Sequence, residues 1–238
     1  MSLTELFLLF IFSLAGALGG WKIKIHNPIY LKLMIAYTGG FLLAVCLLHL
    51  LPEVYQSGIE QIPAFVLGGF ILQILLDQMS AGVEHGHIHI HTHDSAWKPL
   101  IILSGLYLHS LMEGLPLAGH DHNHAHASHD LYLAVALHKL PEGFALGILL
   151  RELNRQAILS WVAILLFACM TPLGSFVSFF VSDSALDYAL PILLALVIGL
   201  FLHLSTTILF EAGTSEHQIS FKRILAILMG IFTAYLVI

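Results

Sequence analysis

Eight apolar runs, each near the length of a membrane-crossing helix, dominate this chain. They occupy residues 2–20, 31–51, 62–82, 100–119, 131–150, 157–181, 189–210 and 219–238. A helix rises about 1.5 Å per residue, so about 20 apolar residues cross the roughly 30 Å hydrocarbon core of a bilayer. Hydrophobic residues make up 58% of the 238 residues and charged residues only 10%. The sequence therefore predicts an all-α membrane protein with eight transmembrane helices, forming one domain over residues 1–238.

The basic residues predict the orientation of these spans. Lys and Arg fall in or beside the first, third, fifth and seventh loops: Lys22, Lys24, Lys32, Lys98, Arg151, Arg155, Lys222 and Arg223. Short cytoplasmic loops are enriched in such residues, so we expect both termini to lie outside. The first run could alternatively be a signal peptide, but Glu5, rather than a basic stretch, precedes its apolar core.

Two neighbouring spans carry the same polar pattern. His109 precedes Glu113 by four residues in the fourth span, and His138 precedes Glu142 by four in the fifth. This spacing places each pair on one helix face. A charged group at the bilayer centre costs roughly 2.5–3.5 kcal/mol, so repeated ones indicate function. In antiparallel helices the four residues fall at similar depths, and we expect them to converge near the membrane midplane.

Two imidazoles and two carboxylates form a ligand set that suits Zn²⁺, Fe²⁺, Mn²⁺ or Cd²⁺, and the absence of thiolates disfavours Cu(I). We therefore predict a metal site formed by His109, Glu113, His138 and Glu142. The alternative is that these side chains only form hydrogen bonds between helices.

With these motifs the sequence resembles the ZIP (Zrt/Irt-like) divalent metal transporters over its whole length. The resemblance implies uptake of Zn²⁺ or a similar ion toward the cytoplasm by alternating access, with the metal as substrate and no cofactor. It also implies a 3+2+3 bundle, in which spans one to three and six to eight are inverted repeats around spans four and five. Ser110 stands where the family often has Asn. Family members are often dimers, so a homodimer is compatible with the resemblance.

Two positions depart from the pattern of binuclear family members. Lys139 stands where those members have Asp, and Thr171 stands where they have Glu, directly before Pro172. Both changes remove a carboxylate, and Lys139 adds an ammonium group. We therefore predict a mononuclear site with Lys139 as a fixed counter-ion. The alternative is that Lys139 extends toward the membrane surface.

Further polar residues fall on either side of this site. His49 and Glu53 repeat the four-residue spacing at the outer end of the second span, and His203 and Glu211 lie toward the inner end of the seventh. We predict a path for the ion along these residues. The alternatives are a helix cap at Glu53 and a hydrogen-bonded buried His203.

Two loops are rich in histidine. The predicted cytoplasmic loop, residues 83–99, contains His85, His87, His89, His91 and His93. The predicted outer loop, residues 120–130, contains His120, His122, His124, His126 and His129. Such tracts lack the spacing of one tetrahedral site and favour weak metal capture. They could instead be merely polar loops.

Other functions fit less well. A cation diffusion facilitator, which exports metal, would have six spans and a cytoplasmic domain. An intramembrane zinc metalloenzyme would need an open water position and a general base, and the usual His-Glu-x-x-His helix is absent, so we expect no enzyme activity. A metal sensor would bind without transport. The net charge of -6 disfavours nucleic-acid partners. We expect a multi-pass protein in contact with lipid, in a plasma membrane such as the bacterial inner membrane.

Overall fold

The computed structural model describes residues 2–23, 29–85, 97–118, 125–153, 157–177, 183–211 and 220–237, and this part of the chain is helical, without strands. The helices are α1 (Leu3–Lys22), α2 (Ile29–Val45), α3 (Leu51–Tyr55), α4 (Ile62–Ser80), α5 (Lys98–Gly114), α6 (Ala125–Glu152), α7 (Ala157–Val177), α8 (Asp183–Glu211) and α9 (Phe221–Val237). Three short segments join them: the π-helix η1 (Cys46–Leu50) and the 3₁₀ turns η2 (Val83–His85) and η3 (Leu115–Ala118).

Seven helical segments of the described chain are long and apolar enough to cross a membrane. They are Leu3–Lys22, Ile29–Tyr55, Ile62–Ser80, Lys98–Leu117, His129–Glu152, Ala157–Phe176 and Tyr188–Phe210. The eighth predicted span coincides with α9, which has 17 residues, at the lower end of the length that crosses a bilayer. The all-α prediction is confirmed, and the eighth span stays a prediction.

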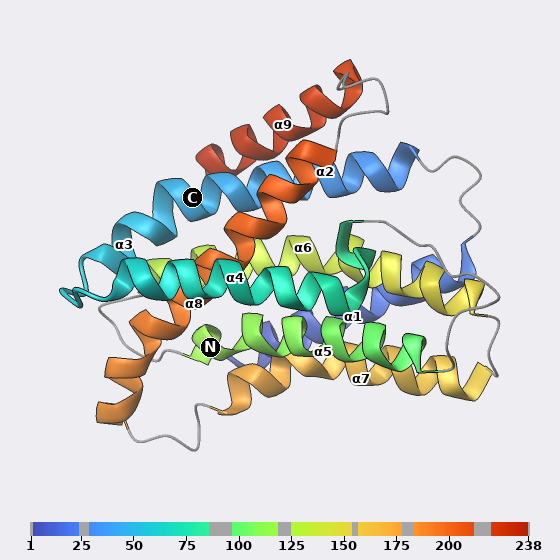
Figure 1. The fold of residues 1–238 in the computed structure, drawn as a ribbon, viewed down its shortest axis with the longest axis horizontal. Helices are drawn as coiled ribbons and strands as arrows, with labels where there is room; N and C mark the ends of the chain where they lie inside the picture. Colours follow the sequence, from blue (N-terminus) through green and yellow to red (C-terminus); the bar gives the residue numbers. More distant parts are fainter. Residues whose placement is uncertain are drawn as a thin grey trace.

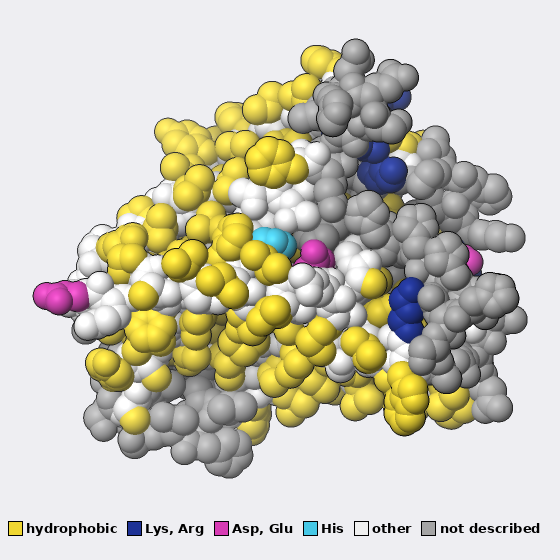
Figure 2. Space-filling view, in the orientation of Figure 1, with side chains coloured by type: hydrophobic (Ala, Val, Ile, Leu, Met, Phe, Trp, Pro, Cys, Tyr) yellow, Lys and Arg dark blue, Asp and Glu magenta, His cyan; other side chains and the backbone are white. Residues whose placement is uncertain are grey.

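The surface is apolar where a soluble protein would be polar. Leu67, Ile71 and Leu75, four residues apart on α4, are each more than half exposed. Figure 2 shows many hydrophobic side chains on the described surface between the left and right ends of the molecule. The Lys and Arg side chains on this face gather toward the right of the view. Lipid contact accounts for such a surface, because exposed apolar rows of this extent are rare on soluble monomers.

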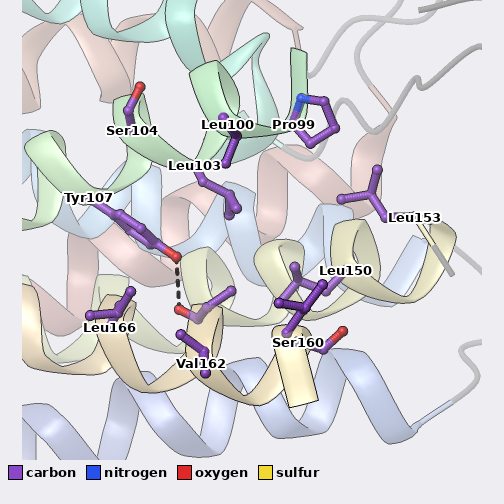
Figure 3. A pocket seen from close by; sticks show the side chains of 12 residues that line it. Pro99, Leu100, Leu103, Ser104, Tyr107, Leu150, Leu153, Ser160, Val162 and Leu166 are labelled. Carbon is purple, nitrogen blue, oxygen red and sulfur yellow. Dashed lines mark hydrogen bonds between the residues drawn. The ribbon is translucent and has the colours of Figure 1, made fainter. Parts of the chain in front are cut away.

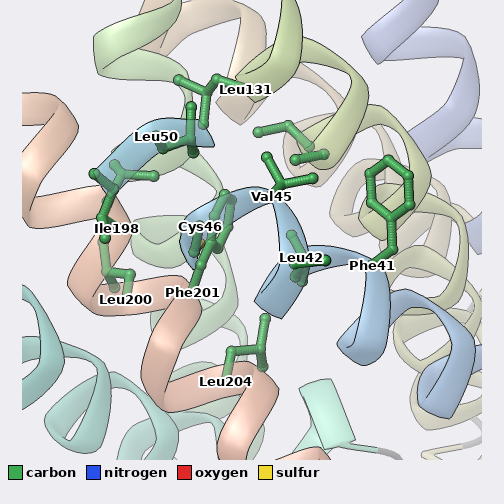
Figure 4. Close-up of a cluster of buried hydrophobic side chains, with 14 of the residues drawn as sticks. Phe41, Leu42, Val45, Cys46, Leu50, Leu131, Ile198, Leu200, Phe201 and Leu204 are labelled. Atoms are coloured by element: carbon green, nitrogen blue, oxygen red, sulfur yellow. The ribbon is translucent and has the colours of Figure 1, made fainter. Parts of the chain in front are cut away.

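The helices pack in close pairs: α1 with α6, α2 with α9, α4 with α8 and α5 with α7. Figure 1 shows α2 and α9 along one side of the bundle and α5 and α7 along the other, with α4 and α6 between them. A buried apolar cluster joins α2, α6 and α8 through side chains such as Val45, Leu131 and Phe201 (Figure 4). The bundle therefore surrounds α6, which carries half of the predicted metal ligands.

Small residues let α1 and α6 approach closely. Gly16 and Gly20 on α1 face the backbone of α6, and Gly143 and Gly147 on α6 face the backbone of α1. A Cβ atom at Gly143 would lie 2.7 Å from the carbonyl oxygen of Ser13, which leaves no room for a side chain. Rows of small residues four apart are a common way for membrane helices to pack. The Gly143 of the polar motif thus has a packing role.

The predicted loop boundaries need correction. Residues 125–130 of the predicted outer loop 120–130 are helical, because α6 begins at Ala125. In the predicted loop 83–99, residues 83–85 form η2, and α5 begins at Lys98. The apolar pattern marks only the part of a helix that faces lipid or the core, so it does not reveal polar terminal turns of a helix.

Candidate metal site

Two helices bring the four predicted ligands together. His109 and Glu113 come from α5, and His138 and Glu142 come from α6. One ligand atom from each residue lies within 4.8 Å of the others, and all four side chains are buried. Within the described ranges, no other group of three or more His, Cys, Asp or Glu residues converges in this way.

The distances between the ligand atoms in this group are close to those around a bound cation. Nε2 of His109 lies 3.0 Å from Oε1 of Glu113, and Nε2 of His138 lies 3.9 Å from oxygens of both Glu113 and Glu142. Tetrahedral Zn²⁺, with bonds of about 2.0–2.2 Å, separates its ligand atoms by about 3.3–3.6 Å. Neither Nε2 of His109 nor Oε1 of Glu113 has a hydrogen-bond partner among the described residues. Small side-chain adjustments would let these atoms coordinate one ion.

Lys139 points into this group rather than toward the membrane surface. Its fully buried ammonium lies 2.5 Å from Oε2 of Glu113 and 2.6 Å from Oε2 of Glu142. It donates a hydrogen bond of 2.9 Å to Oγ of Ser110, which donates one of 3.1 Å to Oε1 of Glu142. The ring of Phe167 lies 5.3 Å from the ammonium, within cation–π range. Lys139 therefore bridges both carboxylates.

Thr171 supports the site from α7. Its buried hydroxyl donates a hydrogen bond of 3.0 Å to the backbone carbonyl of Ser110. The backbone of Thr171 also faces Gly114, where α5 and α7 touch without an intervening side chain. Gly114 of α5 thus packs against α7 in the same way that Gly143 of α6 packs against α1.

Two buried residues that the sequence analysis did not single out complete the surroundings of His109. Nδ1 of His109 lies 2.8 Å from Oε1 of Gln73, and Nε2 of Gln73 donates a hydrogen bond of 2.6 Å to Oε2 of Glu84. Gln73 lies on α4 and Glu84 in η2, and both side chains are buried. Gln73 is recognisable in the sequence as a polar residue inside an apolar run, whereas Glu84 falls in the predicted His-rich loop.

An apolar cavity lies elsewhere in the described part of the chain. It has a volume of about 430 Å³ and opens between α5, α7 and the end of α6 (Figure 3). Its lining is mostly aliphatic and contains no Asp, Glu, His or Cys, and Tyr107 donates a hydrogen bond of 3.0 Å across it to the carbonyl of Ala163. Because it offers no metal ligand, this cavity is separate from the His/Glu group.

Comparison with known families decides the classification. The family model described as "ZIP Zinc transporter" matches residues 84–237, about two thirds of the chain. The chain belongs to the ZIP zinc transporter family. The zinc transporters ZIP1 of Bos taurus and Homo sapiens are each 28% identical to it over 240 residues, covering 79% of this chain and 72% of theirs. Protein zntC of Dictyostelium discoideum is 31% identical over 126 residues, covering 51% of this chain and 30% of its own length.

The outer residues predicted for this ZIP protein have one unexpected neighbour. Nδ1 of His49 lies 3.6 Å from Oδ2 of Asp130, a buried residue near the start of α6. His49 is carried by η1, where the N–H of Leu51 bonds to the carbonyl of Cys46, five residues back. Pro52, which has no N–H, follows directly and favours this wider turn. Glu53 lies on α3, one turn after His49.

The remaining predicted residues are placed only in part. His203 lies on α8, and its ring packs edge-on against Phe70 of α4 at 5.0 Å. His129 is exposed at the start of α6. His87, His89, His91, His93, His120, His122 and His124 lie outside the described residues, as do the side chains of His85, His126 and Glu211.

Proposed function

We propose that this ZIP protein carries Zn²⁺ across a membrane toward the cytoplasm by alternating access around His109, Glu113, His138 and Glu142. The observation that carries the proposal is the convergence of these four buried side chains between two membrane-length helices. Two buried carboxylates that share one ammonium, that of Lys139, leave one negative charge for a metal cation to balance. Family membership supports zinc as the substrate, and it supports transport rather than catalysis.

The charge of the group supports binding of a single ion. Glu113 and Glu142 contribute two negative charges, and Lys139, in contact with both, contributes one positive charge. One Zn²⁺ would change the net charge of this buried group from about −1 to about +1. A second would raise it to about +3, which the one further buried carboxylate beside His109, Glu84, would offset only in part. Lys139 therefore takes the place of a second metal ion.

Two matching sets of glycine contacts support the inverted repeat of the 3+2+3 bundle. Gly16 on α1 faces the backbone of Leu140, and Gly174 on α7 faces that of Leu111. Leu140 and Leu111 each follow the motif histidine of their helix by two residues. The pair α1–α6 therefore corresponds to the pair α7–α5, as expected if α1 and α7 begin equivalent repeats.

The outer helix pairs, α2–α9 and α8–α4, show the same kind of correspondence. Gly40 on α2 faces Ile227 on α9, three residues before Gly230, which faces Tyr37 of α2. Gly199 on α8 likewise faces Val66 on α4, and Gly69, three residues after Val66, faces Leu196 of α8. Both helix pairs therefore have the same three-residue spacing between a glycine and the residue that the partner helix's glycine faces. The pairs α2–α6 and α4–α5 lack an equally extensive counterpart in the described chain, and symmetry is thus reduced near the site.

The distribution of charge supports the proposed orientation, with eight spans and both termini outside. Both chain ends lie toward the left of Figure 1, whereas the Lys and Arg side chains visible in Figure 2 gather toward the right. Placing the basic end in the cytoplasm puts His49 on the outer side of the site, and Asp130 beside it adds a carboxylate to the entry path. His203 then lies on the way in. The host would be a plasma membrane.

Uptake by purified protein tests this function. Proteoliposomes with the wild-type chain should accumulate Zn²⁺, whereas Glu113→Ala and Glu142→Ala should lose at least nine tenths of the flux, because each carboxylate both binds the ion and offsets its charge. Exposed Glu60→Ala serves as the matched control for removal of a carboxylate. Wild-type flux through correctly inserted Glu113→Ala or Glu142→Ala protein would refute the assignment.

A further inference from the structure

Gln73 and Glu84 are buried polar residues that the proposed transport site does not itself use. Gln73 is 0% exposed to solvent, and Glu84 is 1% exposed. Oε1 of Glu84 has no hydrogen-bond partner among the described residues. Burying a carboxylate with one oxygen unpaired is unfavourable, so its place beside His109 calls for a physical reason.

The hydrogen bonds among these residues determine the direction of each group. A carboxylate oxygen only accepts hydrogen bonds, so the amide NH₂ of Gln73 must face Glu84, at 2.6 Å. The amide oxygen of Gln73 then faces His109, with Oε1 2.8 Å from Nδ1. Because this oxygen can only accept, Nδ1 of His109 must carry the proton. Nε2, on the far side of the ring and 3.0 Å from Oε1 of Glu113, is then the nitrogen that offers its lone pair to an ion shared with that carboxylate.

We propose that Gln73 and Glu84 are positioning residues, which fix the tautomer and the ring direction of His109 so that Nε2 is presented to the metal ion. The proposal rests on the proposed function, in which His109 binds the ion. A ligand histidine commonly donates its other N–H to such a partner, and loss of that partner typically weakens metal binding 10–100-fold. Here the partner is an amide, and the carboxylate acts one step further out.

The packing of α5 on α4 makes this contact feasible. Gly105 lies one turn before His109, and a Cβ atom there would lie 2.8 Å from the backbone nitrogen of Ser80 and 3.1 Å from the carbonyl oxygen of Leu76. The helices can therefore approach closely enough for Gln73 to reach His109. Val83, beside Glu84 in η2, is buried in an apolar cluster with Ile102 and Leu106 of α5, which anchors the turn.

Geometry favours a positioning role for Glu84 over direct binding of the ion in this cluster. Oε2 of Glu84 lies 3.9 Å from Nδ1 of His109, whereas Glu113 lies 3.0 Å from Nε2. The two carboxylates thus face opposite edges of the imidazole ring. An ion held by Nε2 together with Glu113 would have the ring between itself and Glu84.

Three variants of the full-length protein test the proposal. Gln73→Leu removes the acceptor for Nδ1, and Glu84→Leu removes the group that orients the amide. The double variant Gln73→Glu/Glu84→Gln exchanges the two groups, so that a carboxylate accepts from His109 and an amide donates to it, with the total charge unchanged. The dissociation constant for Zn²⁺ is measured by competition with a chelator, and the tautomer of His109 is read from ¹⁵N shifts, assigned with His109→Asn.

We expect Zn²⁺ binding about 10–100-fold weaker in Gln73→Leu, about tenfold weaker in Glu84→Leu, and within about threefold of wild type in the exchanged variant. With Zn²⁺ bound, wild-type protein should show the proton on Nδ1 of His109 and the ion on Nε2, and Gln73→Leu should show a mixture of Nε2-bound and Nδ1-bound imidazole. A purely structural role would not move this ratio. If the single variants fail to fold, the wild-type and exchanged proteins still provide the tautomer measurement.

Different failures have different meanings. Wild-type affinity and tautomer in Gln73→Leu, or Zn²⁺ bound through Nδ1 of His109 in the wild type, would overturn the positioning role alone. An exchanged variant as weak as Gln73→Leu would also overturn it. Wild-type affinity in His109→Asn would instead overturn the proposed metal site, and with it any role of Gln73 and Glu84 there.

Discussion

Replacing Lys139 by Met should tighten binding of the first metal ion and slow its release. Methionine fills a similar volume beside Phe167 but removes the charge that contacts Glu113 and Glu142. The two carboxylates would then face each other without a counter-ion, and a divalent cation is the group that best restores the balance. The variant should therefore be less stable without metal and gain more stability from binding it.

The distances set the scale of this effect. The ligand atoms lie within 4.8 Å of one another and Lys139 touches two of the same carboxylates, so ion and ammonium would be roughly 4.5 Å apart. At an effective dielectric constant of about 20, charges of +2 and +1 at this distance repel by about 7 kcal/mol. Repulsion between the freed carboxylates, relieved by proton uptake, cancels much of the gain. A net gain of one fifth of this repulsion, about 1.4 kcal/mol, would still lower the dissociation constant about tenfold.

Equilibrium dialysis with radioactive zinc and thermal unfolding measure this directly. In Lys139→Met we expect a dissociation constant at least tenfold lower, a larger Zn²⁺-induced rise in Tm, and a lower maximal uptake rate in proteoliposomes. Lys222→Met is the matched control, because Lys222 is exposed at the start of α9 and should change none of these. Unchanged or weaker Zn²⁺ binding in well-folded Lys139→Met would refute the counter-ion role.

Three further predictions concern the site and its surroundings. Lys139→Asp combined with Thr171→Glu should raise tightly bound metal from one ion per chain toward two, because it exchanges an ammonium for two carboxylates; a stoichiometry of one by dialysis would contradict this. Gly143→Ala should lower the free energy of unfolding by about 1–3 kcal/mol, since its Cβ would meet the carbonyl of Ser13 at 2.7 Å. Gly68→Ala, with ordinary contact to Leu196 at 3.7 Å, should change it by less than about 1 kcal/mol in the same thermal assay. Uptake at limiting Zn²⁺ should fall when the outside pH is lowered from about 7.5 to about 5.5, because protons compete with metal for imidazole nitrogens; excess Zn²⁺ should restore it, and stimulation at low pH would indicate proton coupling instead.

Local patterns were sufficient for the helical class and for the identity of the polar motifs. Span length and apolar content are properties of one segment, and seven of the eight predicted runs correspond to helices able to cross a membrane. The four-residue spacing of His109 and Glu113 is likewise a property of one helix, and the 3.0 Å separation of their side-chain atoms follows from it. Because the fourth and fifth spans are antiparallel neighbours, the sequence also predicted that His138 and Glu142 lie at a depth similar to that of His109 and Glu113.

The surroundings of the motifs depended on contacts between distant segments. Gln73 meets His109 from 36 residues away in the sequence, and no helical or strand period relates two residues at that distance. Glu84 follows a run that ends at residue 82, so its burial depends on η2 folding back against α4, α6 and α8 rather than on local hydropathy. The direction of Lys139 was also open, because a lysine in a membrane helix can extend toward either the surface or a partner. Only the packing of α5, α6 and α7, with glycines where α5 meets α7, encloses that ammonium between two carboxylates. Burial and pairing are properties of the assembled bundle and not of any one helix.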